Sequence, residues 1–298
     1  MTGFRVWATA GDRIAFIATI HGRSGLWTQR FGAAQPSRLG PPACGKEEQT
    51  DQLAAGPNGS WGCLERTVGN SSSFFSVDVI SSRGAARHVA SATGATSIPQ
   101  IVGDGSYLGY LLVTSKKAVH LVPITAPGRR GRVATLAGAP VPKAAAVANG
   151  ILALLAVDGS VAVYTTTGKR LAQIKANAAS IAVTANRIVV RARSRRLVVY
   201  GPRGGLVHSW PLAAKAWTAG LGSDGRYADY LGANKAVHVV RLSNGVDKIL
   251  ARAGKGWYFD GVSLEAPGAV VPLTTQQGRS FLVTLRFLPN AALKRSLG

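Results

Sequence analysis

Short apolar runs that alternate with glycine-rich turns recur along the whole chain. Residues 13–17, 151–155 and 188–190 are examples, each rich in β-branched or aliphatic side chains. Runs this short, bounded by glycine or polar residues, favour strands over helices. Each run follows a pair of residues suited to a two-residue hairpin, which needs positive φ at one or both central positions. The seven pairs are Gly11-Asp12, Asn58-Gly59, Asp104-Gly105, Asn149-Gly150, Ala185-Asn186, Asp224-Gly225 and Pro267-Gly268.

The seven pairs are nearly evenly spaced. Counted between their second residues, the steps are 47, 46, 45, 36, 39 and 43 residues. Each unit also holds a second apolar run and a second turn. These turns stand at Gly32, Gly84, Gly128, Gly168, Gly204-Gly205, Asn244-Gly245 and Pro289-Asn290. A four-stranded unit that repeats at about 40 to 45 residues is typical of a β-propeller blade.

The pattern therefore predicts an all-β fold, a single β-propeller domain over residues 1–298 with seven four-stranded blades. A propeller with six or with eight blades is the alternative. A β-sandwich also has regularly spaced strands, but it does not require both turn signals to return together. The predicted blades cover approximately residues 1–42, 50–92, 97–138, 143–176, 178–212, 214–254 and 257–298.

Several units carry the residues of known propeller repeats. Residues 11–16, followed by Gly25-Leu26-Trp27, Gly32 and residues 37–39, resemble the repeat of TolB-type propellers, which are WD-repeat-like bacterial proteins. Residues 104–107 and 223–227 repeat the same entry motif, and residues 158–164 with 167–169 are similar to quinoprotein-like propeller repeats. The resemblance implies strands and turns, and it brings no active-site residue.

The amino-acid composition is typical of a folded protein without a transmembrane helix. With 46% hydrophobic and 16% charged residues, the chain can bury a full core. It holds no run of 18 apolar residues, so no transmembrane helix is expected. No signal peptide is recognisable at its start. We nevertheless favour an extracytoplasmic location, which includes the periplasm, the cell wall and the medium, with the cytoplasm as the alternative.

The two cysteines underlie that preference. Cys44 and Cys63 lie within one loop-rich stretch. A disulfide between them would close a loop of about 20 residues and contribute roughly 3 kcal/mol. An even cysteine count fits an oxidising compartment, and two unpaired buried thiols are the alternative. No histidine lies near either cysteine, so a zinc site is not expected.

The formal net charge is +22, with 24 Arg and 11 Lys against 13 acidic residues. Such a field attracts polyanions. Basic clusters stand at Arg129, Arg130 and Arg132 and at residues 191–196, where the alternation of Arg191, Arg193 and Arg195 predicts three guanidinium groups on one face. An anionic cell-surface polymer and a basic surface without a dedicated ligand both stay open. Nucleic acid is disfavoured, because no basic-aromatic module appears.

Candidate catalytic residues are few. Asp12, Asp104, Asp158 and Asp224 belong to hairpin turns. Asp229 and Asp260 lie in adjacent units and are the pair that a glycosidase-like site in the central funnel would use. His120 and His238 hold equivalent third-strand positions and could meet at a metal. Neither arrangement is specific, so we predict no catalytic, cofactor-binding or metal-binding residue.

The stretches at residues 227–230 and 257–260 are candidates for a rim where a partner docks, because aromatic side chains and Arg dominate binding hot spots. The predicted rim consists of Arg129, Arg130, Arg132, Arg193, Arg195, Tyr227, Tyr230, Trp257 and Tyr258. The sequence thus predicts a monomeric, non-catalytic binding scaffold that recognises a protein or an anionic surface polymer through its loop faces. The alternative is an enzyme with a central-funnel site acting on a glycan or a small metabolite.

Overall fold

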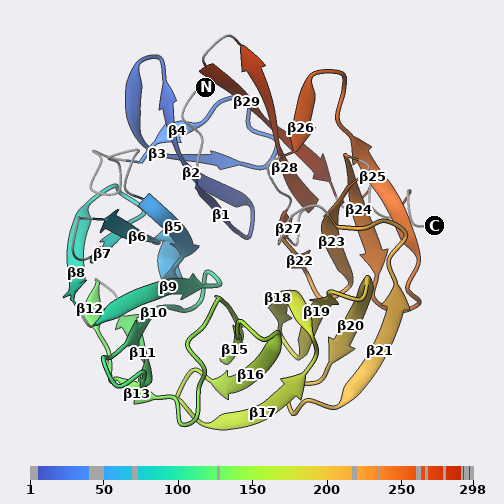
Figure 1. Ribbon diagram of the computed structural model, residues 1–298. Coiled ribbons are helices and arrows are strands. Elements are labelled where there is room, and N and C mark those ends of the chain that lie inside the picture. Colours follow the sequence, from blue (N-terminus) through green and yellow to red (C-terminus); the bar gives the residue numbers. More distant parts are fainter. Residues whose placement is uncertain are drawn as a thin grey trace.

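Seven antiparallel sheets stand around a common axis in the described part of the chain (Figure 1). This computed structural model confirms the prediction of an all-β, seven-bladed propeller. It describes residues 6–39, 50–68, 73–94, 96–125, 128–216, 220–233, 235–259, 263–265, 268–277, 280–289, 291 and 295.

In the first three sheets, strands follow one another outward from the axis in chain order. The first sheet holds β1 (Trp7–Ala10), β2 (Arg13–Ile20), β3 (Arg23–Arg30) and β4 (Ser37–Arg38). The second holds β5 (Thr50–Ala55), β6 (Trp61–Val68), β7 (Ser73–Ile80) and β8 (Ala86–Thr93). The third holds β9 (Ser97–Gly103), β10 (Leu108–Val113) and β11 (Val119–Thr125), and its outer position is shared by β12 (Arg129–Arg130) and β13 (Ala134–Thr135).

The next three sheets repeat the same order. The fourth holds β14 (Ala144–Ala148), β15 (Ile151–Leu155), β16 (Ser160–Thr165) and β17 (Arg170–Lys175). The fifth holds β18 (Ala178–Thr184), β19 (Arg187–Ala192), β20 (Arg196–Tyr200) and β21 (Leu206–Pro211). The sixth holds β22 (Gly222–Ser223), β23 (Tyr227–Gly232), β24 (Ala236–Arg241) and β25 (Asp247–Arg252).

The seventh sheet differs in its inner strand, which is divided in two. Its strands are β26 (Trp257–Phe259), β27 (Ser263–Glu265), β28 (Gly268–Gln277) and β29 (Ser280–Pro289). Both β26 and β27 pair with the same edge of β28, while β29 pairs with the other edge. Among the described elements the one helical segment is the 3-10 turn η1 (Pro57–Gly59), and no described helix is long and apolar enough to span a membrane.

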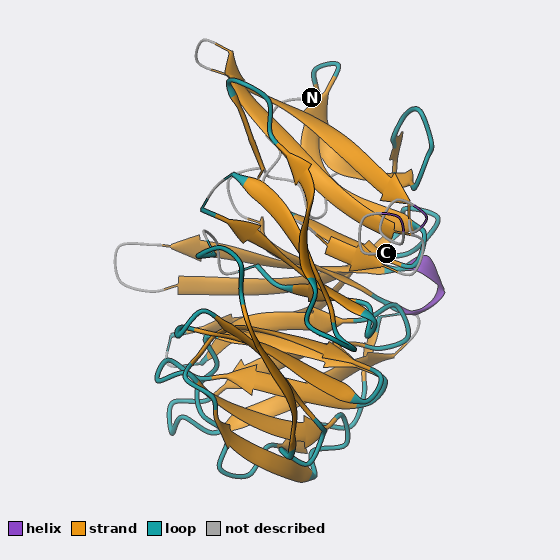
Figure 2. Ribbon diagram, turned by 90° about the vertical axis from the view of Figure 1, so that its right-hand side faces the viewer, coloured by secondary structure: helices purple, strands orange, loops and turns teal. Residues whose placement is uncertain are grey.

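The antiparallel order divides the loops between two faces of the ring, as the side view shows (Figure 2). We name the hairpin face after the turns that join the first and second strands of each sheet, such as Asn149-Gly150. The turns between third and fourth strands lie on the same face. We name the opposite side the connector face, since the segments between sheets and the turns between second and third strands lie there.

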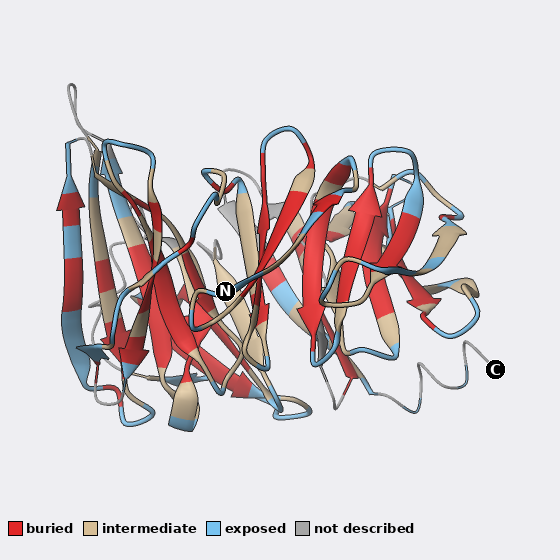
Figure 3. Ribbon diagram, turned by 90° about the horizontal axis from the view of Figure 1, so that it is seen from below, coloured by how far each residue is buried: buried red, intermediate tan, exposed pale blue. Residues whose placement is uncertain are grey.

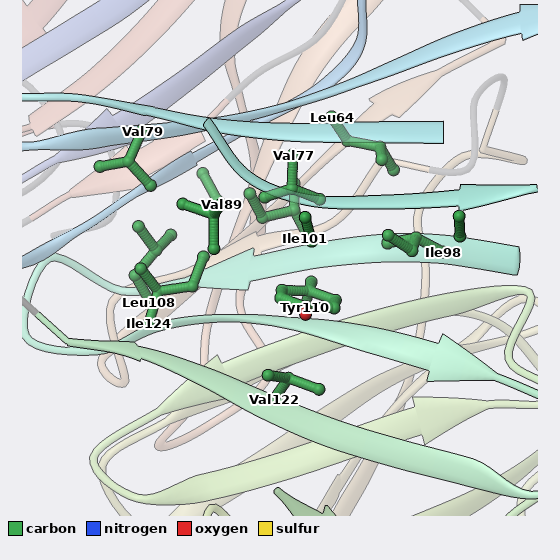
Figure 4. Packing of buried hydrophobic residues seen from close by; sticks show 13 residues of the cluster. Leu64, Val77, Val79, Val89, Ile98, Ile101, Leu108, Tyr110, Val122 and Ile124 are labelled. Atoms are coloured by element: carbon green, nitrogen blue, oxygen red, sulfur yellow. The ribbon is translucent and has the colours of Figure 1, made fainter. Parts of the chain in front are cut away.

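Each sheet is buried on both sides, because a neighbouring sheet covers each of them. On β16, Val161, Ala162, Val163 and Tyr164 are all fully buried, so the strand has a continuous apolar run instead of an alternating one. Burial is concentrated in the strands and exposure in the loops (Figure 3). Figure 4 shows the cluster between the second and third sheets, where side chains of β7 and β8 pack on those of β9, β10 and β11.

The ring closes where the first and seventh sheets meet, through side chains. Ile14 and Phe16 on β2 and Trp27 on β3 form one buried cluster with Val270 on β28. Phe31 and Phe287 add an edge-to-face ring contact with centroids 5.3 Å apart. Within the described residues no strand of the first sheet pairs with a strand of the seventh. Apolar packing therefore joins the two ends of the ring.

Candidate functional site

The channel along the ring axis is lined by the innermost strands of six sheets. Its volume is about 440 Å³. Small or apolar residues such as Ala8, Gly103 and Ala145 form most of the wall, and Thr9 and Ser223 add hydroxyl groups. None of the described lining residues is acidic, basic or a histidine.

None of Asp229, His120 and His238 is among the residues that line this channel. Asp229 on β23 is fully buried, and its Oδ1 accepts a hydrogen bond of 2.8 Å from the Gly222 amide. Asp260 lies outside the described residues. His120 contacts Thr135 Oγ1 at 3.1 Å, whereas His238 is buried beside Asp247. No group of three or more potential metal ligands occurs in the part of the chain that the structure describes.

The predicted basic loops divide between the two faces. Arg129, Arg130 and Arg132 are exposed on the hairpin face, next to the turn that ends β11. The Arg130 Nε donates to the Val89 carbonyl at 2.8 Å, which ties this loop to the second sheet.

Arg193 and Arg195 are exposed on the connector face. The Arg193 guanidinium donates to the Val157 carbonyl at 3.1 Å, and Arg195 has a positive φ of 60°. Arg191 does not join them, because it is buried and its Nε donates to Ser180 Oγ at 3.0 Å. The prediction of three guanidinium groups on one face is therefore wrong: the strand ends at Ala192, and the turn breaks the alternation.

The four predicted aromatic residues also do not form one rim. Tyr227 is half-buried and packs between the sixth and seventh sheets. Trp257 and Tyr258 line a hollow of about 630 Å³ on the connector face, together with Lys235 and Lys255. Tyr230 is 1% exposed and belongs to the core between the fifth and sixth sheets, so its assignment to an exposed rim is wrong.

Tyr230 instead belongs to a buried polar network centred on Asp247. The Tyr230 hydroxyl and the Ala213 amide donate to Asp247 Oδ2 at 2.7 and 2.9 Å, and His238 Nδ1 lies 2.9 Å from Oδ1. The Tyr230 and His238 rings stack with centroids 4.7 Å apart. Burial favours the neutral carboxyl, but the three hydrogen bonds outweigh it, so the pKa of Asp247 lies below its usual value. This network ties the sixth sheet to the segment entering it.

An apolar pocket opens on the hairpin face between the second and third sheets. Its volume is about 550 Å³. Val79, Leu108 and Ile124 form its floor and lie at one end of the cluster in Figure 4. Ser81, Ser82 and Arg87 lie at its polar margin. Gly128, which also lines the pocket, directly precedes Arg129 and Arg130, so the predicted basic loop borders an apolar hollow.

The sequence did not single out a second pocket on this face, between the fifth and sixth sheets. Arg187, Arg226 and His208 are among its lining residues. Arg187 and Arg226 each directly follow a predicted hairpin turn, at residues 185–186 and 224–225. Basic residues directly after the turns of two successive units are the signal that could have identified this pocket.

The predicted disulfide stays a prediction. Cys63 on β6 is fully buried in the core between the first two sheets. Cys44 lies outside the described residues.

No family model and no curated protein sequence matches the chain. Solved structures are similar to it in fold. Prp20p from Saccharomyces cerevisiae is 13% identical with a TM-score of 0.57, over 97% of this chain and 84% of that chain. The computationally designed Ika8 protein is 12% identical with a TM-score of 0.55, over 95% and 87% of the two chains. Human WBSCR16 is 10% identical with a TM-score of 0.54, over 80% and 78%.

Identities this low show the fold alone. Prp20p is a protein that binds Gsp1p and histones. A β-propeller of this kind is consistent with a binding or scaffold role, because propellers host many functions on one framework. The likeness does not select one propeller family, so the resemblance to TolB-type repeats stays a prediction.

Proposed function

We propose that this chain is a non-catalytic binding propeller that docks an acidic protein segment on its hairpin face, over the apolar pocket. The observation that carries the proposal is the position of that pocket beside exposed arginines. Arg87 lines it, and Arg129 and Arg130 follow its residue Gly128.

An apolar pocket with a basic margin suits a protein partner. An apolar side chain that fills the pocket supplies affinity, while the arginines attract and orient acidic residues around it. An anionic polysaccharide or polyphosphate supplies charge, but it has no apolar side chain to fill the pocket. The protein-binding role of Prp20p, which shares the fold, gives further support.

We place this function outside the cytoplasm and propose a Cys44–Cys63 disulfide. The even cysteine count supports both parts. The mass of the protein after alkylation, with and without prior reduction, tests the disulfide. Alkylation of both cysteines without reduction would contradict it.

Three fluorescent peptides of equal length test the binding function by anisotropy. The first is rich in Glu with a central Phe, the second replaces this Phe by Ala, and the third keeps Phe among Lys residues. We expect the first to bind about tenfold more tightly than the second, and the third not to bind. Added salt should weaken the binding, since exposed charges are screened.

Two substitutions locate the binding. Ala86→Phe places a ring in the pocket, and Arg130→Gln removes a charge beside it. Both should weaken binding of the first peptide. Ala233→Phe and Arg23→Gln are the matched controls, because both residues are exposed on the connector face. Equal affinity for the Phe and Ala peptides, or binding that survives Ala86→Phe, would contradict a role for the pocket. Failure of every peptide to bind would overturn the acidic-segment proposal.

A further inference from the structure

The second pocket of the hairpin face, which we call the arginine pocket, combines basic groups with an apolar wall. It lies between the fifth and sixth sheets, which are neighbours in the ring (Figure 1). Its basic lining residues are Arg187, Arg226, Arg241 and His208, and Val199 and Leu242 are apolar. Its volume is about 490 Å³, several times that of an inorganic phosphate ion.

Arg187 and Arg226 both line this space, one from each of the two sheets. Arg187 stands two residues before Val189, and Arg226 stands two residues before Ala228. Val189 and Ala228 are both fully buried in the cluster between the fifth and sixth sheets. Residues i and i+2 of a strand point to the same side. Alternation therefore directs Arg187, the first residue of β19, toward this pocket, and Arg226, in the turn directly before β23, lines the pocket from the facing sheet.

The backbone around these residues is held firmly. Asp224 Oδ1 accepts hydrogen bonds of 2.8 Å from the Arg226 and Tyr227 amides, and the Leu242 amide donates to the Arg226 carbonyl at 2.8 Å. His208 pairs with Val199 across the fifth sheet and stacks on Trp210, with ring centroids 4.9 Å apart. The Arg226 backbone and the His208 ring are thus ordered before any ligand binds, which lowers the entropy lost on binding.

The charge of the pocket is not balanced within it. None of its described lining residues is acidic. No ion pair involves Arg187 or Arg226 within the described ranges. Arg241 also lines the pocket, but its neighbours Val240 and Leu242 face the cluster between the fifth and sixth sheets, so alternation points the Arg241 side chain away. Two guanidinium groups that face one cavity repel each other, and an anion between them relieves that repulsion.

We infer that the arginine pocket binds a small organic phosphomonoester, a site separate from the apolar pocket. Guanidinium groups match phosphate oxygens with paired donors, and His208 can donate from a ring nitrogen. The guanidinium groups of Arg187 and Arg226 come from different sheets. They can therefore contact different oxygens of a tetrahedral phosphate dianion, whereas the two oxygens of a carboxylate lie in one plane. The apolar wall at Val199 and Leu242 then contacts the organic part, for which the volume leaves room.

Isothermal titration with phenyl phosphate, inorganic phosphate and benzoate tests the inference on the full chain. We expect one saturable site for phenyl phosphate, at least about tenfold tighter than for benzoate and tighter than for inorganic phosphate. Arg187→Gln and Arg226→Gln should each weaken phenyl phosphate binding about tenfold or more. Arg203→Gln is the matched control, because Arg203 is exposed in the turn between β20 and β21 on the same face and does not line the pocket.

Arg226 is exposed, so its substitution leaves the fold intact even if Arg187→Gln does not fold. Equal affinity for phenyl phosphate and benzoate would overturn the inference. Unchanged binding in Arg226→Gln, or absence of saturable binding, would overturn it as well. The outcome is independent of the acidic-segment proposal, since Ala86→Phe should leave phenyl phosphate binding unchanged.

Discussion

At the scale of single residues, the Asp247 carboxylate shows how this propeller uses its few acids. It is buried, and three donors from two strands and a connecting segment satisfy it. Asp78 in the second sheet also pairs with a histidine: its Oδ1 lies 3.1 Å from His88 Nδ1. The Asp78 side chain is mostly buried, but the His88 side chain is 54% exposed. The same residue pair thus occurs once with a buried histidine and once with a solvated histidine.

We predict that Asp247→Asn destabilises the fold by about 3 kcal/mol, because it removes a buried charge and replaces one of the two acceptor oxygens by an NH2 donor. The pKa of Asp247 is below its usual value of 3.8 in the folded state, so its stabilisation is present above that pH and is lost as the pH falls through the folded pKa. Urea unfolding at neutral pH and near pH 3 measures both effects.

The difference between wild type and Asp247→Asn should therefore shrink in acid. Asp78→Asn serves as the control and should cost less than about 1 kcal/mol, because its histidine partner is solvated. A difference for Asp247→Asn that is the same at both pH values would contradict the prediction.

The predicted rim residues show which side-chain contacts can and cannot be predicted from the sequence. Tyr227 and Tyr230 are three positions apart on one strand, so they point to opposite sides, and the structure places them in different clusters. Once the strand is recognised, its period predicts this separation. That Tyr230 is buried and bonded to Asp247 could not be predicted, because the partners are 17 residues apart and meet only when the sheet forms.

At the scale of elements, the turns explain why the blades could be recognised. Asn149 and Gly150 have positive φ values of 46° and 77°, the geometry that their hairpin signal predicts. The turns between second and third strands were harder to recognise, because Lys117, Arg195 and Lys235 occupy left-handed conformations there. Such residues give no turn signal in the sequence.

We predict that Lys117→Gly stabilises the fold by about 1 kcal/mol. Lys117 has a φ of 58°, a conformation costly to residues with a Cβ and accessible to glycine. Its amide donates to the Thr114 carbonyl at 2.9 Å, a bond that glycine keeps. Thermal unfolding followed by circular dichroism measures the change.

Lys116→Gly is the neighbouring control, since Lys116 has no positive φ. It should give no stabilisation, because glycine there only adds conformational freedom to the unfolded chain. Stabilisation of the same size by both substitutions would show that left-handed strain is not the cause.

At the scale of the whole molecule, the ring depends on apolar contacts between sheets. The period of the turns predicted seven sheets and their order. It could not predict how the first and seventh sheets meet, because Phe16 and Val270 are far apart in the chain and give no pairing signal. It also did not predict the divided inner strand of the seventh sheet.

We predict that Phe16→Ala destabilises the fold by about 4 kcal/mol, through lost burial and the cavity left behind. Its effect should be concentrated where the first and seventh sheets meet. Hydrogen exchange of the amides of β2, β3 and β28 should accelerate first, as the least stable part of a structure opens before the rest.

Leu154→Ala is the control, because Leu154 is equally buried in the core between the third and fourth sheets. It should accelerate exchange in those two sheets and leave the contact between the first and seventh sheets unchanged. Uniform acceleration in both variants would contradict a localised closure.

Each described sheet is formed by strands that are consecutive in the chain, and this has a consequence for how such a protein can evolve. A duplication or deletion that spans one repeat adds or removes a complete sheet with its own backbone ladder, and it separates no strand from its partner. Propeller size can then change by whole units, with apolar side chains at the new boundary as the part that selection has to adjust.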